Sequence, residues 1–168
     1  HNRGTSLMFD FTNKNVLVVG ASKAGIGAAI ARAFKTAGAE VEITGVEDAP
    51  APEDQGAFAY HKLDVTDPDA VLELAAKTSK LDILINGAAI TARGEEMAPA
   101  FFEKVVDVNL HGTFRIAEAF HGHLARQGGS LINIASMYAV FGSPNNPAYG
   151  ASKAAVQQLT KSLAIAWA

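Results

Sequence analysis

The sequence contains no cysteine, only one tryptophan among its 168 residues, and no long hydrophobic run. Without cysteine the chain can form neither a disulfide framework nor a thiolate metal site, and a thiol nucleophile is excluded. Its apolar runs fall short of the roughly 18 residues that a membrane-spanning helix needs. We therefore expect a globular protein of a reducing compartment, with a cytoplasmic location as the default.

A large excess of charge of one sign is also lacking. The chain has 14 Lys and Arg against 17 Asp and Glu, which gives a formal net charge of -3. No basic stretch could follow a phosphate backbone, so nucleic acid and anionic membranes are poor candidate partners. An apolar content of 49% with 18% charged residues instead predicts one globular domain with a substantial core.

The two ends of the sequence are unusual for a native chain. Residues 1–7 begin with His and lack the apolar stretch of a signal peptide. We expect them to be foreign to the native protein, with Met8 as its start. Residues 163–168 form an apolar helical run that stops without a capping residue. We therefore expect residues 8–168 to form a single domain that lacks a C-terminal portion.

Short β-branched runs alternate with longer segments of helical periodicity from Asn15 onward. The segments expected to form strands are 16–19, 41–44, 58–63, 81–85 and 131–135. The segments expected to form helices are 28–37, 70–77, 100–125 and 149–168. This order predicts a doubly wound α/β fold with three layers, in which helices cover both faces of a parallel sheet. The connection 45–57 contains two prolines and is too short for a full helix.

A glycine-rich loop separates the first expected strand from the first expected helix. Glycines in this context permit a tight turn and let the backbone approach a pyrophosphate, which then rests on the free N–H groups of the helix N-terminus. The candidate binding residues are Gly20, Ser22, Lys23, Gly25, Ile26 and Gly27. A turn that only packs the helix against the sheet is the alternative for this motif alone, whereas the spacing excludes a Walker-type loop.

Tyr149 and Lys153 lie four residues apart, so a phenol and an ammonium share one face of the last expected helix. Tyrosine titrates near pH 10, and acid/base catalysis near neutrality needs a pKa about 3 pH units lower. A neighbouring ammonium acts in that direction. For this pair alone, a half-buried tyrosine beside a solvated lysine is the alternative.

Two further polar residues precede this pair. Ser136 is expected at the end of the strand 131–135, at the carboxyl edge where open α/β sheets bind ligands, and its hydroxyl could hold a substrate oxygen. Asn109 lies within the long expected helix 100–125, where an amide is a mediocre helix former. We therefore expect a local distortion of that helix at Asn109.

Together these motifs resemble the classical short-chain dehydrogenase/reductase family across residues 16–168. The residues that match the catalytic tetrad of the family, in order and spacing, are Asn109, Ser136, Tyr149 and Lys153. Asp64 and Val65 match its adenine-contacting pair after the third strand. Asn86 and Ala88 are the transferable positions of a segment similar to the family's Asn-Asn-Ala-Gly. Agreement of independent motifs along one chain makes the resemblance highly specific.

The resemblance implies an NAD(P)-dependent oxidoreductase that moves a hydride between nicotinamide C4 and a carbonyl or secondary alcohol. Tyr149 would then be the general acid/base, and Lys153 would lower the pKa of Tyr149 and bind the nicotinamide ribose. Ser136 would stabilise the substrate oxygen, and Asn109 would anchor a water in a proton relay from Lys153. The family also implies a Rossmann-type domain, a homodimer or homotetramer, and C-terminal strands and a substrate lid that the sequence lacks.

The choice between NAD and NADP rests on conflicting features. Gly45 stands where members that use NAD usually carry Asp, and Lys23 could serve the 2′-phosphate of NADP in a glycine loop one residue longer than usual. Acidic residues that would repel this phosphate are Glu47, Asp48, Glu53 and Asp54. Glu47 also stands where members resembling dihydroxybenzoate dehydrogenases place an acid. We expect NAD to be preferred, with NADP as the alternative.

Two alternative functions are consistent with part of the sequence. A sugar-nucleotide epimerase or dehydratase shares the Tyr–Lys pair, although its usual glycine spacing differs. A dinucleotide-binding sensor without turnover is the second alternative. No metal site is expected from His111, His121 and His123, because no carboxylate pattern completes one. The residues expected on a core face or a surface between subunits are Phe101, Phe102, Phe114 and Phe120.

Overall fold

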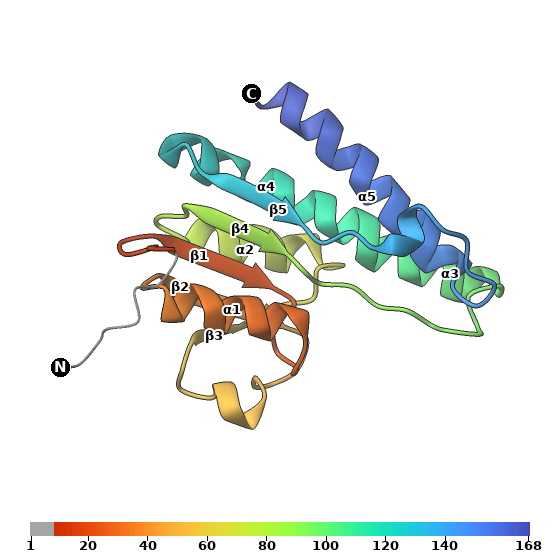
Figure 1. Ribbon diagram of the computed structural model, residues 1–168, viewed down its shortest axis with the longest axis horizontal. Helices are drawn as coiled ribbons and strands as arrows, with labels where there is room; N and C mark the ends of the chain where they lie inside the picture. Colours follow the sequence, from red (N-terminus) through yellow and green to blue (C-terminus); the bar gives the residue numbers. More distant parts are fainter. Residues whose placement is uncertain (1–8) are drawn as a thin grey trace.

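The computed structural model describes residues 9–168, so the expectations for residues 1–7 and Met8 lie outside the described residues. Within the described range, five strands form one parallel sheet in the order β3-β2-β1-β4-β5 (Figure 1). The strands are β1 (Asn15–Val19), β2 (Glu40–Gly45), β3 (Ala59–Lys62), β4 (Ile83–Asn86) and β5 (Ser130–Asn133). The predicted Rossmann-type parallel sheet is thereby confirmed.

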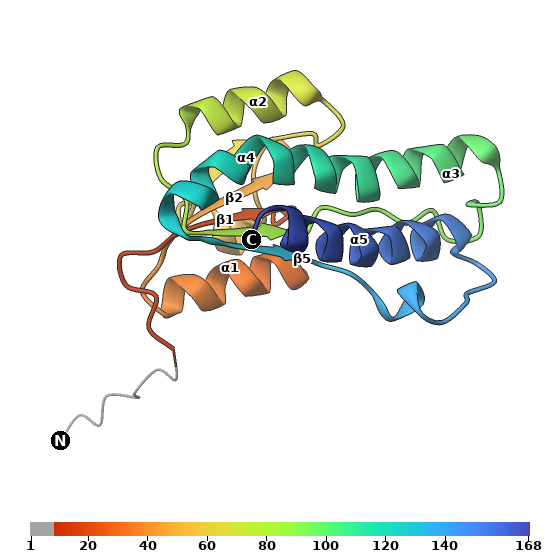
Figure 2. The ribbon, with the colours of Figure 1, turned by 90° about the horizontal axis from the view of Figure 1, so that it is seen from above.

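Helices cover both faces of this sheet, as Figure 2 shows. α1 (Ile26–Thr36) lies on one face, and α2 (Pro68–Lys77) and α4 (Thr113–Gln127) lie on the other. The last helix, α5 (Pro147–Ala166), is tied to β5 by a hydrogen bond of 2.9 Å from Asn133 Nδ2 to Thr160 Oγ1. No helix in the described part of the chain has the length and hydrophobicity to cross a bilayer.

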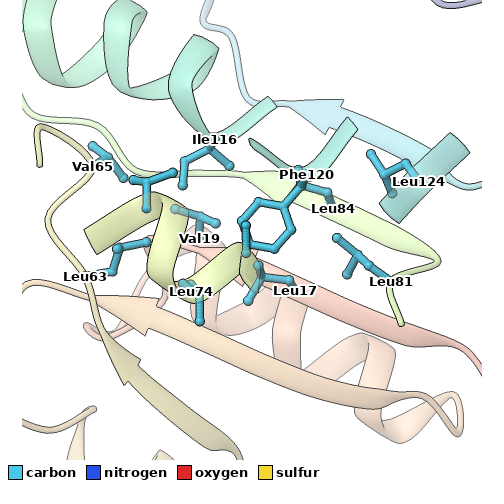
Figure 3. Packing of buried hydrophobic residues seen from close by; sticks show 12 residues of the cluster. Leu17, Val19, Leu63, Val65, Leu74, Leu81, Leu84, Ile116, Phe120 and Leu124 are labelled. Carbon is cyan, nitrogen blue, oxygen red and sulfur yellow. The ribbon is translucent and has the colours of Figure 1, made fainter. Parts of the chain in front are cut away.

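Alternate residues of the central strand β1 supply two hydrophobic cores. Leu17 and Val19 face α2 and α4, in a core that contains the fully buried Phe120 (Figure 3). Val16 and Val18 face α1 on the opposite side. Burial on both faces is typical of a central strand of a parallel sheet. All five strands pair in parallel, so their carboxyl ends lie at one edge of the sheet.

The helix boundaries follow local signals in the sequence. α2 begins at Pro68, and Asp67 caps it by accepting hydrogen bonds from Asp69 N and Ala70 N at 3.0 and 3.1 Å. This is the cap and early proline that the sequence predicts. The connection between β2 and β3 contains a single short 3-10 turn, η1 (Pro52–Asp54), in agreement with an abbreviated crossover.

The long predicted helix 100–125 is interrupted, and the predicted strand 131–135 is too long. α3 (Pro99–Val106) and α4 are separated by a π-helical segment, η2 (Asp107–Gly112), which contains Asn109. The expected distortion at Asn109 is thus confirmed. β5 ends at Asn133, so the placement of Ser136 at the end of this strand is wrong. Ser136 instead precedes a 3-10 turn, η3 (Met137–Ala139).

We predict that truncating Phe120 destabilises the fold far more than truncating a neighbouring surface phenylalanine. Phe120 is 0% exposed and Phe114, on the same helix, is 46% exposed. Phe120→Ala should lower the free energy of unfolding by about 3–5 kcal/mol because it leaves a cavity, and Phe114→Ala by about 1 kcal/mol or less. Urea unfolding of both variants tests this. Equal losses would mean that the core is not centred on Phe120.

Candidate active site

A cleft of about 680 Å³ opens at the carboxyl edge of the sheet, between the segments that follow β1, β2, β3 and β4. Ligands of open α/β sheets bind at this edge. The predicted cofactor-binding residues that line it are Gly20, Ser22, Lys23, Gly25, Ile26, Gly27, Glu47, Asp64, Val65 and Ala88. Asn86 lies beneath the cleft, where its Nδ2 donates to Thr113 O and to Asn133 Oδ1 at 3.2 and 3.0 Å.

The glycine loop packs too tightly for side chains at two of its positions. Gly20 has a φ of +84°, and a Cβ there would lie 2.5 Å from the backbone of Ala88. A Cβ at Gly27 would overlap the carbonyl oxygen of Gly20. A Cβ at Gly25, in contrast, would meet no atom closer than Lys23 O, at 3.9 Å. The loop therefore leaves open space beside the N-terminus of α1.

The N-terminus of α1 is suited to an anion. Its N-cap residue, Gly25, makes no side-chain hydrogen bond to the helix. The first turn of the helix contains no acidic residue. The N–H groups of a first helical turn lack partners within the helix and carry a partial positive charge. Open space beside such a turn fits a dinucleotide pyrophosphate, so the observed cradle is compatible with an NAD(P) cofactor.

Glu47 forms a polar cluster at the end of β2. Its carboxylate accepts hydrogen bonds from Ser22 Oγ and from Lys23 Nζ, the latter at 2.7 Å. The hydrogen bonds from Lys23 and Ser22 lower the pKa of Glu47 to about 2. Ser22 also fills the space beside Gly45, where an added Cβ would overlap the Ser22 side chain. An acid at position 45 would therefore clash, and Glu47 supplies a carboxylate two residues later.

The other acids of this loop do not line the cleft. Asp54 is 1% exposed, and Arg32 Nη1 on α1 contacts its two carboxylate oxygens at 2.8 and 2.7 Å. Asp48 pairs with Lys62 Nζ at 2.6 Å. The buried ion pair of Asp54 and Arg32 therefore attaches the loop between β2 and β3 to α1. Repulsion of a 2′-phosphate in this part of the cleft would come from Glu47, which is itself paired with Lys23.

Asn109 is fully buried where the π-helical segment meets the loop after β4 and α5. Its Oδ1 accepts from Ile90 N at 2.8 Å, and its Nδ2 donates to Ile90 O at 3.0 Å and to Ser152 Oγ at 3.1 Å. Its own carbonyl accepts from Thr113 Oγ1 at 2.8 Å. The amide side chain of Asn109 therefore connects the π-helical segment to the loop after β4, through Ile90, and to α5, through Ser152.

Tyr149 and Lys153 lie on the first half of α5. Lys153 is 2% exposed, and its Nζ donates to Ile134 O at 2.7 Å and lies 5.8 Å from the centroid of the Tyr149 ring. Burial lowers the pKa of Lys153 to about 8. Ser152 Oγ donates to Tyr149 O at 2.8 Å, which connects Tyr149 to Asn109. The shared helix face predicted for the pair is therefore observed.

Ser136 lies in the loop that covers the start of α5. Its Oγ accepts a hydrogen bond from Tyr138 N at 3.2 Å. The Tyr138 and Tyr149 rings meet edge to face, with centroids 6.3 Å apart. The turn η3 thus brings the segment containing Ser136 next to the helix that carries Tyr149.

Ser152 and Thr113 were not singled out from the sequence. Ser152 follows Tyr149 by three residues, so helical spacing alone places it near Tyr149. Its contact with Asn109, which lies 43 residues earlier, depends on the packing of α5 against the π-helical segment. No local pattern in the sequence indicates that contact.

The parallel sheet, the glycine cradle and the pair of the half-buried Tyr149 and the buried Lys153 are features of a Rossmann-type domain of the oxidoreductase class. Residues 14–168 match the family model described as short chain dehydrogenase. The chain therefore belongs to the short-chain dehydrogenase family, as the resemblance predicted.

Named relatives agree with this assignment. The chain is 35% identical over 163 residues to 3-oxoacyl-acyl-carrier-protein reductase of Rickettsia prowazekii, covering 93% of this chain and 67% of the relative. It is 38% identical over 163 residues to 2,3-dihydro-2,3-dihydroxybenzoate dehydrogenase of Escherichia coli, covering 93% and 64%. The ligand-free structure of Thermoplasma acidophilum aldohexose dehydrogenase has a TM-score of 0.84 at 33% identity, covering 94% and 62%. The chain thus spans 62–67% of the length of these three relatives.

The lowered pKa of Lys153 predicts a distinct dependence of stability on pH. In the unfolded chain this ammonium has its ordinary pKa of 10.5, and in the folded protein its pKa is about 8. Between these values the unfolded chain binds more protons, so Lys153 becomes less destabilising as the pH rises through this interval. The wild type should therefore gain stability relative to Lys153→Met over this range. Urea unfolding at a series of pH values measures the difference, and parallel profiles would contradict the desolvation of Lys153.

Proposed function

We propose that the protein containing this chain is an NAD(P)-dependent alcohol dehydrogenase or ketone reductase, with Tyr149 as its general acid/base. The observation that carries the proposal is the placement of a buried ammonium, Lys153, beside the Tyr149 ring on a helix at the ligand-binding edge of the sheet. A buried charge is costly to maintain. A role in binding and proton transfer accounts for its retention better than packing does.

The cofactor would lie along the cleft. Its pyrophosphate would rest between the glycine loop and the N-terminus of α1, its adenine between Asp64 and Val65, and its adenosine ribose against Glu47. Lys153 and Tyr149 would bind the nicotinamide ribose. When bound, the nicotinamide would supply or accept the hydride. The protein residues would orient the reactants and move the proton.

Proton transfer would centre on Tyr149. Its phenol would protonate the carbonyl oxygen during reduction, or remove the hydroxyl proton during oxidation, while Ser136 donates a hydrogen bond to the same oxygen. Lys153 would stabilise the charge on the phenolate. Asn109 would anchor a water in the relay from Lys153 through its backbone carbonyl, which can accept a second hydrogen bond beside that from Thr113.

The names of the relatives support an oxygenated substrate. They include a 3-oxoacyl reductase, a dihydrodiol dehydrogenase and an aldohexose dehydrogenase, names that denote substrates with a ketone or hydroxyl group and at least one further oxygenated carbon. We propose a substrate of this general class, and a homodimer or homotetramer as the assembled protein. An epimerase or dehydratase would return the cofactor unchanged, and a sensor would release no product.

Removing the Tyr149 hydroxyl should abolish turnover without preventing cofactor binding. In the intact protein, Tyr149→Phe should lower kcat by about 10²–10⁴-fold, because it removes the acid/base. Oxidation of NADH by ethyl acetoacetate, a small 3-oxoester, provides the assay, and nicotinamide fluorescence reports NADH affinity. Tyr138→Phe is the matched control, since it removes a neighbouring phenol and keeps the ring contact with Tyr149. Turnover by Tyr149→Phe at the wild-type rate would refute this role of Tyr149.

Glu47 should determine the cofactor preference. The intact protein should bind NADH at least about tenfold more tightly than NADPH, which corresponds to about 1.4 kcal/mol. Glu47→Ala should reduce this preference, because it removes the carboxylate that would accept the ribose hydroxyls. Asp48→Ala, whose carboxylate pairs with Lys62 outside the cleft, serves as the control. Tighter binding of NADPH by the wild type would instead assign the dominant role to Lys23.

A further inference from the structure

Glu96 is a fully buried carboxylate that neither lines the cofactor cleft nor belongs to the tetrad. It lies in the loop between β4 and α3. Its Oε1 accepts hydrogen bonds from Thr91 Oγ1 at 2.8 Å and from Ala92 N at 2.9 Å, within the same loop. Its Oε2 accepts from Tyr149 N at 2.8 Å. Glu96 therefore contacts the backbone of the residue whose side chain is the proposed acid/base.

The contacts of Glu96 require an ionised carboxylate. Ala92 N and Tyr149 N can only donate, and the Thr91 hydroxyl accepts from Asn146 Nδ2 at 2.6 Å, which leaves its own proton free for Glu96. Burial acts to raise the pKa of Glu96, but these hydrogen bonds outweigh it, so the pKa is lowered overall. A neutral amide at this position would turn its NH₂ group toward a backbone N–H in either orientation.

The same carboxylate replaces a local cap at the start of α5. Tyr149 is the third residue of this helix, so its N–H has no partner within the helix. Asn146, at the N-cap position, makes no side-chain hydrogen bond to the helix. A carboxylate at a helix N-terminus is favoured by the helix dipole. The first turn of α5 is therefore held by a residue from another loop, 53 positions earlier in the chain.

The loop that carries Glu96 is fixed at its other end by the tetrad itself. Asn109 bonds to both the N–H and the carbonyl of Ile90. Gly94 N donates to Asn145 O at 2.9 Å, which adds a second connection to the segment before α5. Residues 90–96 thus form a brace between the π-helical segment and the first turn of α5.

We propose that Glu96 is a positioning residue, whose carboxylate fixes the first turn of α5 and thereby aligns the Tyr149 phenol with the substrate. This inference rests on the proposed role of Tyr149 as acid/base. Lys153 is held separately, through Ile134 O, and of residues 90–96 only Ile90 lines the cofactor cleft. Loss of the Glu96 carboxylate should therefore impair the proton-transfer step and leave NADH affinity nearly unchanged.

Amide hydrogen exchange tests the structural half of this proposal without depending on activity. Glu96→Gln turns a donor toward the N–H of Tyr149 or Ala92 and leaves that N–H unpaired. We expect whichever of these two amides faces the donor to exchange about tenfold faster or more, because a buried donor without a partner is costly, while the C-terminal half of α5 is unchanged. Glu95→Gln is the matched control, since Glu95 is adjacent and exposed. Unchanged exchange at both Tyr149 and Ala92 in Glu96→Gln would overturn the proposal, and so would unchanged exchange at Tyr149 in Glu96→Ala, which removes both acceptor oxygens.

Kinetics with NADH and ethyl acetoacetate in the intact protein test the functional half. We expect Glu96→Gln to lower kcat by about tenfold or more with NADH affinity retained, and Glu95→Gln to match the wild type. Faster exchange with an unchanged kcat, or equal loss of kcat and NADH affinity, would reduce Glu96 to a structural residue and overturn the proposal. An inactive wild type would instead refute the proposed function, and the exchange data would still decide the structural half.

A second pair of variants covers the case in which Glu96→Gln does not fold. Thr91→Val removes the hydroxyl hydrogen bond that orients Oε1 of Glu96, and Thr91→Ser keeps it. Thr91→Ser should retain more of kcat and of the Tyr149 amide protection than Thr91→Val, because only the serine can donate to Oε1. Identical behaviour of the two variants would contradict the role of the Glu96 network.

Discussion

The position of α5 depends on buried polar bonds made by its first half. Glu96 holds the backbone of Tyr149, Asn109 holds Ser152, and Ile134 O holds the Lys153 ammonium. Such bonds are strong where water is excluded, and leaving any of their donors or acceptors unpaired is costly. They restrict α5 to one position relative to the sheet. The Tyr–Lys pair and its proposed chemistry depend on that restriction.

The central elements could be predicted because their signals are local. The central strands β1 and β4 are buried by helices on both faces, so each appears as a short apolar run between polar segments. Asp67 and Pro68 mark the start of α2 by capping chemistry alone. Asn109 predicted a distortion because an amide with hydrogen bonds to make elsewhere is poorly accommodated in a regular helix. The fold class and the family followed from several such signals in order.

The residues that sequence reasoning misplaced or missed depend on long-range contacts. β5 ends before Ser136, and the carbonyl of Ile134, just beyond the strand, is bonded to Lys153 on α5. The sequence places Asp54 among the acids that would repel a 2′-phosphate, but in the structure it is buried against Arg32 of α1 and does not line the cleft. Glu96 follows Gly94 and Glu95, a polar context that is typical of an exposed turn. Only the packing of the loop against α5 reveals that its carboxylate is enclosed.

The most direct test of the account is whether a hydride is transferred at all. NADH deuterated at both C4 positions would be incubated with ethyl acetoacetate and the intact protein, and the product analysed by mass spectrometry. Enzymes of the proposed class should place deuterium on the carbinol carbon of the hydroxyester. Binding of NADH without deuterium in any product, over the range of oxygenated substrates named for its relatives, would contradict the account and indicate a dinucleotide-binding sensor.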